Sequence, residues 1–439
     1  MKRLLACLTC ILSVACGRTA GEPIDSEGWC GDGLVLGWEE CDDANGDGFD
    51  GCSACRVSEF LVARSILFMS QAAVSVAVDG RFAVVWADWD GDGDGVFGRV
   101  FVDGEGGPVF RANDRWRNDE RSPDVAAAGG GFVVAWTSNG QDGDDLGVFA
   151  RIYGPDGTSP EPEFQVNERY LGNQSSHRVA AGAAGGSVLA WDSDDYSVNG
   201  VFARLLGEDG SPLGSELRVS PDLEGYQSLH SVMMDGYGGF IVAWIERTPP
   251  SDERVLRIRR YGPDGSALGS VITLDVPAAV WPHSISMAMA ADGSFVVVWG
   301  VADEEDRLEA YGRRYDRDGS PVGPVFPVTD GGVPSGVGPY MAMGADGRFV
   351  VMWSEMEDSA HYDVERVTAR LFDEDGSPRT PGLCVVDAAG IHINLFDVAA
   401  APRGGFIVVW EAGSPAWSER FLLAQRFDER GAPLGLAPW

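Results

Sequence analysis

The hydrophobic positions of this chain recur in short, almost wholly apolar runs that end in tryptophan. Such runs, for example FAVVW at 82–86 and FVVAW at 132–136, are typical of strands covered on both faces. The run occurs seven times, and its tryptophans follow one another at intervals of 50 to 57 residues, at Trp86, Trp136, Trp191, Trp244, Trp299, Trp353 and Trp410. A repeat of this length predicts one supersecondary unit copied along the chain.

Every repeat has its parts in the same order. An alternating strand and a Gly-rich turn precede the tryptophan strand, and an Asp-rich loop follows it. A third strand with arginine and aromatic positions then leads through an Asp-Gly turn, which favours a tight hairpin, to a fourth strand. Four antiparallel strands per repeat and few segments that favour helices predict an all-β fold, a seven-bladed β-propeller.

The two ends of the chain indicate how the ring is closed. The last repeat lacks a fourth strand, whereas EFLVA at 59–63 resembles the fourth strand EFQV at 163–166. We therefore expect the N-terminal strand to complete the last blade, which removes two open sheet edges. An open solenoid would instead need capping repeats at its ends, and the sequence shows none, so ring closure is favoured. We expect the tryptophans to pack between sheets and the third-strand arginines to pair with neighbouring carboxylates.

The first residues are typical of a bacterial export signal. Met1-Lys2-Arg3 precedes an apolar stretch at 4–14 that is too short to span a bilayer, and small residues precede Cys16. This resembles the bacterial lipobox, although Ser13 stands where leucine is usual. The resemblance implies that Cys16 is acylated and anchors the chain to a membrane. The alternative is an ordinary periplasmic or secreted protein.

Four cysteines, Cys30, Cys41, Cys52 and Cys55, lie within one short segment that has few apolar residues. In an exported chain they predict two disulfides, because burial alone cannot hold so small a unit. A zinc site is the alternative, but only the last two have a C-x-x-C spacing. Cys384 lies alone in a strand-like run and predicts a buried thiol.

The same segment carries a family resemblance. The residues CGDG at 30–33, EECDD at 39–43, Asn45 and DGCSAC at 50–55 resemble the myxobacterial cysteine-rich repeat, with Trp38 and Ala44 where that repeat usually has glycine. The later repeats are similar to propeller-like repeats of bacterial surface proteins, which define no activity. The expected organisation is a signal peptide at 1–15, a lipid anchor and tether at 16–29, a disulfide-rich repeat at 30–57 and a propeller at 58–439.

Charge narrows the range of partners. The chain of 439 residues has 67 acidic and 33 basic side chains and a formal charge of −34. Such a surface repels phosphate backbones, so nucleic-acid binding is excluded from the expectations.

Two residue patterns suggest metal sites. Alternating carboxylates and glycines after the first tryptophan run suit Ca²⁺, through Asp88, Asp90, Asp92 and Asp94. A solvated acidic hairpin is the alternative. Three histidines, His177, His230 and His283, each stand just before the first strand of a blade. If that strand is innermost, they ring the mouth of the central channel and could hold Zn²⁺.

No nucleophile–base motif is present in the sequence. The leading functional expectation is therefore a non-catalytic binding or adhesion module, a lipoprotein of the outer membrane or cell surface with a protein or polysaccharide ligand. The alternatives are a glycan- or polymer-degrading enzyme on the propeller and a structural envelope protein stiffened by calcium. The enzyme predicts a deep pocket with a strongly perturbed carboxylate.

Overall fold

The structure, a computed structural model, consists of β-strands throughout the part of the chain that it describes. The described residues are 52–53, 56–57, 59–65, 69–114, 118–182, 185–194, 199–221, 226–248, 253–274, 281–302, 307–333, 338–355, 364, 366–387, 392–413 and 420–434. A search of these residues finds no helix with the length and apolar character needed to cross a lipid bilayer.

The predicted cysteine chemistry falls mostly outside this range. Cys16, Cys30, Cys41 and Cys55 lie outside the described residues. Cys52 lies in the backbone strand β1 (Cys52–Ser53), which pairs with β2 (Arg56–Val57). Cys384 is a buried thiol in β28, as the sequence predicts.

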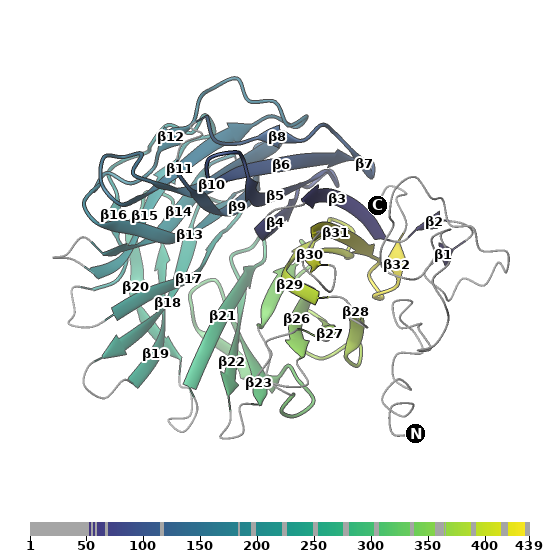
Figure 1. The fold of residues 1–439 in the computed structure, drawn as a ribbon. Coiled ribbons are helices and arrows are strands. Elements are labelled where there is room, and N and C mark those ends of the chain that lie inside the picture. Colours follow the sequence, from purple (N-terminus) through teal and green to yellow (C-terminus); the bar gives the residue numbers. More distant parts are fainter. Residues whose placement is uncertain are drawn as a thin grey trace.

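The repeats form antiparallel sheets whose strands follow one another from the centre outward (Figure 1). One sheet contains β4 (Met69–Val76), β5 (Phe82–Trp89), β6 (Asp94–Val102) and β7 (Glu105–Gly106), with β8 (Phe110–Arg111) also on β6. The next two groups are β9 (Glu120–Ala128), β10 (Gly131–Asn139), β11 (Leu146–Tyr153) and β12 (Phe164–Gln165), then β13 (Asn173–Ala181), β14 (Ser187–Asp194), β15 (Asn199–Leu206) and β16 (Leu217–Arg218). A single parallel bridge between Leu146 and Asn173 joins these two groups into one sheet.

The remaining sheets repeat the same order. They are β17 (Tyr226–Met234), β18 (Phe240–Thr248), β19 (Glu253–Tyr261) and β20 (Ala267–Leu274); β21 (Trp281–Met289), β22 (Phe295–Ala302), β23 (Leu308–Tyr315) and β24 (Pro321–Pro327); and β25 (Tyr340–Met343), β26 (Phe349–Glu355), β27 (Arg366–Phe372) and β28 (Leu383–Asp387). The last sheet contains β29 (His392–Ala400), β30 (Phe406–Gly413), β31 (Arg420–Phe427), β3 (Glu59–Ser65) and β32 (Pro433–Leu434).

The sheets are arranged in a closed ring. The first strand of each sheet contacts the first strand of the next, from β4 through β9, β13, β17, β21 and β25 to β29, and β29 contacts β4 again. The strand β3 comes from the N-terminal side of the ring and pairs antiparallel with β31, as Figure 1 shows where purple meets yellow. The short β32 pairs with the end of β31 that β3 leaves uncovered, an element that the sequence pattern does not predict.

The core lies between adjacent sheets and depends on the residues that define the repeat. The seven tryptophans of the apolar runs are at most 3% exposed. The aromatic residue that opens each run stacks on one from the third strand in five sheets, in the pairs Phe82–Phe101, Phe240–Tyr261, Phe295–Tyr315, Phe349–Phe372 and Phe406–Phe427. The tryptophans are therefore packing residues, as expected.

Arginines of the third strand link several sheets to the one before. In five sheets an Nη1 group donates a hydrogen bond of 2.8–3.3 Å to a carbonyl of the preceding sheet or its connector, in the pairs Arg99–Val62, Arg151–Ala112, Arg204–Val166, Arg259–Val219 and Arg370–Val328. The predicted carboxylate partners are present for three of them, Asp114, Glu168 and Asp330. The common partner is nevertheless the carbonyl.

Side chains also bridge neighbouring sheets close to the axis of the ring. A carboxylate or hydroxyl oxygen of one sheet accepts a hydrogen bond from a backbone N–H of the next sheet's inner strand, at 2.6–3.1 Å. The pairs are Asp397–Val74, Ser75–Ala127, Asp124–Val179, Asp192–Leu229 and Ser286–Met341. Some polar groups near the axis are therefore part of the scaffold.

Replacing Trp136 by alanine tests the packing role. Trp136 is fully buried, so we expect Trp136→Ala to lower the free energy of unfolding by about 3–5 kcal/mol. The matched control is Trp89→Ala, since Trp89 is 45% exposed and its removal should change stability far less. Denaturant unfolding followed by circular dichroism measures both, and equal losses would contradict the packing role.

Candidate functional site

The tryptophan strands all end at the same side of the ring, here called the upper rim, and this side carries a pocket of about 380 Å³. Its volume is in the range of small-ligand sites. The pocket is lined by strands of three successive groups, β11, β13 with β14, and β17. Its lining residues are Leu146, Asn173, Ser175, Asp192, Ser193, Asp194 and Gln227. We call it the Asp192 pocket.

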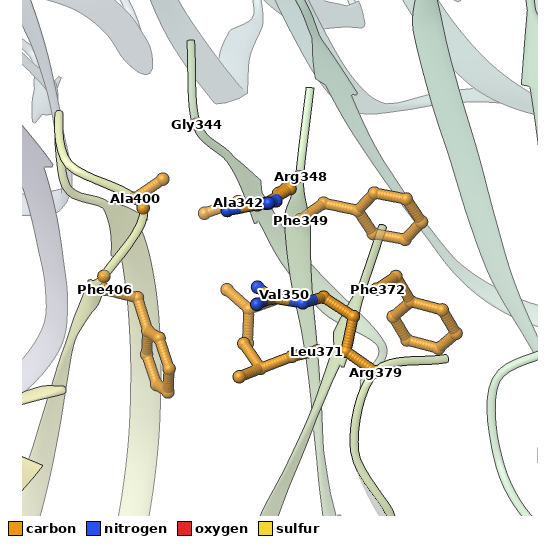
Figure 2. A pocket seen from close by; sticks show the side chains of 12 residues that line it. Ala342, Gly344, Arg348, Phe349, Val350, Leu371, Phe372, Arg379, Ala400 and Phe406 are labelled. Carbon is orange, nitrogen blue, oxygen red and sulfur yellow. The ribbon is translucent and has the colours of Figure 1, made fainter. Parts of the chain in front are cut away.

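A second crevice lies near the opposite side of the ring, between the sheets that begin with β25 and β29. Figure 2 shows Phe349, Phe372, Phe406 and the arginines Arg348 and Arg379 around it. The free space there is about 10 Å³, which is at most one water molecule. This crevice is a packing defect between sheets, and it is too small for a ligand.

Asp192 is the titratable group that stands out in the pocket. Burial raises the pKa of its carboxyl to about 7, although the carboxylate accepts hydrogen bonds from the Leu229 N–H at 2.6 Å and the Ser228 hydroxyl at 3.4 Å. A carboxyl with this pKa exchanges its proton near neutral pH, as general acid–base catalysis requires. Ser176, whose side chain also bonds Asp192, has a φ of 52°, so a strained backbone position adjoins this group.

Arg178 places a positive charge at the centre of the ring. It is exposed, and its Nη1 donates to the His177 carbonyl at 2.8 Å. Burial is the main cause of the raised pKa values of the Asp124 and Asp397 carboxyls and of Tyr340, and the charge of Arg178 lowers each of them. Because these groups belong to β9, β29 and β25, on different sides of the ring, the guanidinium lies in the channel between them.

The histidines occupy a different position from the expected one. His177, His230 and His283 lie within the inner strands β13, β17 and β21, at the points where the register shifts by a bulge. His177 is fully buried, and its Nδ1 lies 3.1 Å from the Thr137 Oγ1 of the preceding sheet, so it does not face the channel mouth. The side chain of His283 lies outside the described part of the structure.

Both described imidazoles are neutral at physiological pH. Burial, assisted by the charge of Arg178, lowers the pKa of His177 to about 3 and that of His230 to about 4. His230 is only partly buried, and it directly follows Leu229, whose N–H bonds Asp192. In the described residues, no three His, Cys, Asp or Glu side chains are grouped so that they could hold a metal ion.

The four carboxylates of the expected calcium loop have separate partners. Asp90 bonds Arg111, Asp94 bonds Arg121 at 3.2 Å, and Asp88 accepts from Ser65 at 2.7 Å. Asp92 is exposed at the turn. The loop is an acidic hairpin tied to neighbouring segments, and calcium binding there stays a prediction.

Sequence reasoning overlooked Asp192, Arg178 and Tyr340. Asp192 directly follows a repeat tryptophan, where the other repeats have Ala87, Thr137, Ile245, Gly300, Ser354 and Glu411. The aspartate at this place in the repeat was the available signal. It did not stand out, because the loop that follows Trp191 contains several other acidic residues. Arg178 and Tyr340 become neighbours only when the ring closes, so no local pattern could bring them together.

Glu120 is a second carboxyl with a large pKa shift, and it has a structural explanation. In two sheets a buried glutamine near the start of the inner strand bonds a connector residue, in the pairs Gln174–Asn167 and Gln227–Ser220. Glu120 occupies the same place and accepts from the Asn113 amide at 2.9 Å. Burial raises its pKa to about 8, so at neutral pH it is a protonated acid that replaces an amide.

Changing Glu120 to glutamine tests this role. The folded-state pKa lies above the unfolded one, so the contribution of Glu120 to stability is complete below about pH 4.5 and is lost as the pH rises toward 8. We expect Glu120→Gln to be near neutral at pH 4.5 and stabilising by a few kcal/mol at pH 8. Unfolding by denaturant across this pH range measures it, and a pH-independent effect would contradict it.

Comparison with protein families gives one match. Residues 26–56 match a domain of unknown function, DUF4215, which agrees with the expected cysteine-rich repeat at that place. A comparison with curated protein sequences gives no match.

Comparison with solved structures gives matches over most of the chain. The crystal structure of polysaccharide lyase Uly1 has a TM-score of 0.55 at 10% identity and covers 83% of this chain and 91% of that one. A polysaccharide lyase of family PL25, an ulvan lyase bound to -[GlcA(1-4)Rha3S]-, has a TM-score of 0.54 at 9% identity, covering 82% and 94%. A protein of unknown function from Dyadobacter fermentans DSM 18053 has a TM-score of 0.50 at 11% identity, covering 84% and 98%.

These matches correct the functional expectation. The leading prediction, a non-catalytic binding or adhesion module, is wrong, because two of these three structures are polysaccharide lyases. They favour the alternative prediction, a glycan-degrading enzyme. At identities near 10%, the likeness itself establishes the propeller fold alone.

Proposed function

We propose that this protein is a glycan-degrading enzyme whose reaction takes place in the Asp192 pocket. Asp192 carries this function, because its carboxyl has a pKa of about 7 and lines an open pocket of about 380 Å³. A perturbed titratable group in a cleft is the usual mark of an active site. The similarity to two polysaccharide lyases supports the choice of glycan as the substrate.

Cleavage of a glycan needs proton transfer at the linkage. Hydrolysis needs an acid for the leaving oxygen, and elimination needs a base for the proton beside a uronate carboxylate. Asp192 and the neutral imidazole of His230 supply groups for either step. Arg178 would stabilise the negative charge that elimination develops on a uronate, and the ulvan lyase bound to a glucuronate-containing ligand favours that reaction.

A substrate panel tests the proposal. The full chain is incubated with uronate polymers (polygalacturonate, alginate, hyaluronan and a sulfated glucuronate–rhamnose polymer) and with neutral xylan and amylose. New reducing ends together with ultraviolet absorbance from a conjugated double bond indicate elimination, whereas reducing ends alone indicate hydrolysis. Neither product from any polymer would overturn the proposed function.

The role of Asp192 predicts the kinetics of a single variant. We expect Asp192→Asn to lower kcat by about 10²–10⁴-fold and to abolish the ionisation near pH 7 from the pH profile of kcat/KM. Asp103→Asn is the matched control. Asp103 is exposed on the turn between β6 and β7, in a different sheet from Asp192, and its φ of 51° suits asparagine. A wild-type pH profile in Asp192→Asn would contradict the assignment.

We further propose that the ring has seven blades, one for each tryptophan repeat, and that the propeller occupies 58–439 behind a disulfide-rich repeat at 30–57. Seven inner strands in a circle of contacts support this count. The DUF4215 match at 26–56 supports a separate N-terminal unit.

An enzyme for polymers that do not enter the cell must be exported. We propose that residues 1–15 direct export and that Cys16 is lipidated, which places the enzyme at the outer membrane or cell surface; Met1-Lys2-Arg3 and the small residues before Cys16 support this. In a bacterial host, metabolic labelling with a fatty acid should label the wild-type chain, whereas Cys16→Ser should remain unlabelled. Equal labelling of both chains would contradict lipidation at Cys16.

A further inference from the structure

The connector between β12 and β13 carries two neighbouring apolar side chains that are exposed at the upper rim. Tyr170 is 52% exposed and Leu171 is 53% exposed. No other two consecutive positions in the described residues expose large apolar side chains to this extent. The ring and hydroxyl of Tyr170 have no hydrogen bond or aromatic contact within the described part of the chain. We call Tyr170 and Leu171 the Tyr170 tip.

Two buried amides hold the backbone on both sides of Tyr170. The Asn167 side chain donates a hydrogen bond from Nδ2 to the Arg169 carbonyl at 2.5 Å. The Gln174 side chain donates from Nε2 to the Leu171 carbonyl at 2.9 Å. Because Asn167 and Gln174 are at most 3% exposed and also bond each other, the peptide groups that flank Tyr170 are fixed from inside the protein.

The connector is also anchored to both neighbouring groups of strands. Glu216, just before β16, accepts a hydrogen bond from the Glu168 N–H at 2.9 Å and pairs with the Arg169 guanidinium at 2.9 Å. On the other side, the Gly172 N–H donates to Asp144, between β10 and β11, at 2.8 Å. The Tyr170 tip is therefore held in one position before any ligand binds, which reduces the entropy that binding costs.

The Tyr170 tip adjoins the Asp192 pocket. Asn173, which follows the tip by two positions, lines the pocket and forms the bridge with Leu146, which lines it too. Ser175, which pairs with Asp192 across the two strands, is two residues further along β13, or about 7 Å. A glycan that occupies the pocket would therefore pass the tip within a few sugar units of Asp192.

Folding does not account for an apolar tip. The hydrogen bonds that hold the connector on either side of Tyr170 are accepted by backbone carbonyls, so polar side chains at these two positions would leave them intact. Exposed apolar patches commonly mark ligand-binding grooves. A sugar ring has hydroxyls around its edge and C–H groups on its faces. Burial of such a face against an aromatic ring and a leucine removes apolar surface from water.

The charges around the tip favour a sugar without charge. Two carboxylates, Glu168 and Asp144, belong to the connector and to its anchor. Arg204 and Arg169 already have carboxylate partners, in the pairs Arg204–Glu168 at 2.6 Å and Arg169–Glu216 at 2.9 Å. A carboxylated or sulfated ring would meet net negative charge here, whereas a neutral ring would meet no such repulsion.

We propose that the Tyr170 tip is a subsite for an uncharged sugar ring of the glycan that is cleaved in the Asp192 pocket. The ring of Tyr170 packs on the C–H face of that sugar, and Leu171 covers its edge. This inference rests on the proposed function and deepens it, because it names the substrate class as a heteroglycan that carries neutral sugars beside acidic ones. Such a glycan differs from the homopolymers of uronate, in which every ring is charged.

Binding measured without cleavage tests this subsite. The Asp192→Asn variant of the full chain is titrated calorimetrically with three polymers that alternate a uronate with a neutral sugar: hyaluronan, unsulfated chondroitin and a desulfated glucuronate–rhamnose polymer. Polygalacturonate and alginate, in which every ring is charged, are the comparison. We expect at least one alternating polymer to bind at least tenfold more tightly than either homopolymer.

Substitutions in the Asp192→Asn background locate the binding. We expect Tyr170→Ala and Leu171→Ala each to weaken binding of that polymer by about tenfold, equally at low and high salt, because the contact is apolar. Tyr170→Phe keeps the aromatic face, so it should retain most of the affinity. The matched control is Tyr237→Ala, since Tyr237 is 69% exposed on the turn between β17 and β18, at the opposite side of the ring. Unchanged melting temperatures establish that each variant is folded.

The outcomes separate this subsite from the proposed function. The subsite would be overturned if the homopolymers bind as tightly as the alternating polymers, if no alternating polymer binds, or if Tyr170→Ala and Leu171→Ala leave the affinity unchanged. Cleavage of any polymer by the wild-type chain would then leave the proposed function standing. Binding that depends on the tip in a protein that cleaves no polymer would support the subsite and overturn the proposed function.

Discussion

The hydrogen bond from a third-strand arginine to a carbonyl of the preceding sheet is the interaction on which the ring depends. Each sheet has two apolar faces, so it must be covered by a neighbour on both sides. The arginine fixes that neighbour at one height and angle, and the side-chain bridges near the axis fix it at a second point. In the sheet of β4, the carbonyl is that of Val62 in β3, so the strand from the N-terminal side supplies both the missing edge of the last sheet and an acceptor for Arg99 of the first.

A scaffold fixed in this way can tolerate unfavourable groups at its centre. The inner strands carry bulges at similar places, and Gln71, Ser122 and Ser176 have positive φ values of 52–55° there. Burial of carboxyl groups near the axis also opposes folding, because a buried carboxylate loses its hydration. The group must then either take up a proton or accept hydrogen bonds from backbone N–H groups. Asp124 and Asp397 use this arrangement to join sheets, whereas Asp192 does so beside an open pocket. Asp124 and Asp397 lie in the inner strands β9 and β29, whereas Asp192 lies in the second strand β14, so its bridge has a different place in the repeat.

The sequence predicted the parts of the fold that depend on local pattern. Periodic tryptophans, Asp-Gly turns and the similarity of residues 59–63 to a fourth strand indicated the repeats, the turns and the pairing of β3 with β31. The site was not predictable in the same way, because Arg178 and Tyr340 are 162 positions apart and the charge of Arg178 reaches Tyr340 only in the folded ring. His177 shows the opposite error: its position in the repeat was noticed, but a bulge turns its ring toward Thr137. The role of Glu120 depends on a correspondence between inner strands that exists only in space. There it takes the same place as the buried glutamines Gln174 and Gln227.

The net charge of −34 is compatible with the proposed reaction on a uronate, because electrostatic forces in salt water are local. At physiological ionic strength a charge is screened within about 8 Å, so acidic turns on the far side of the ring contribute little at the upper rim. What a sugar carboxylate meets there is set by the few nearest groups, and near Asp192 these include Arg178. The remaining acidic surface would repel polymer that is not held at these residues. A single arginine near the Asp192 pocket could therefore attract a sugar carboxylate locally, although the propeller as a whole is acidic.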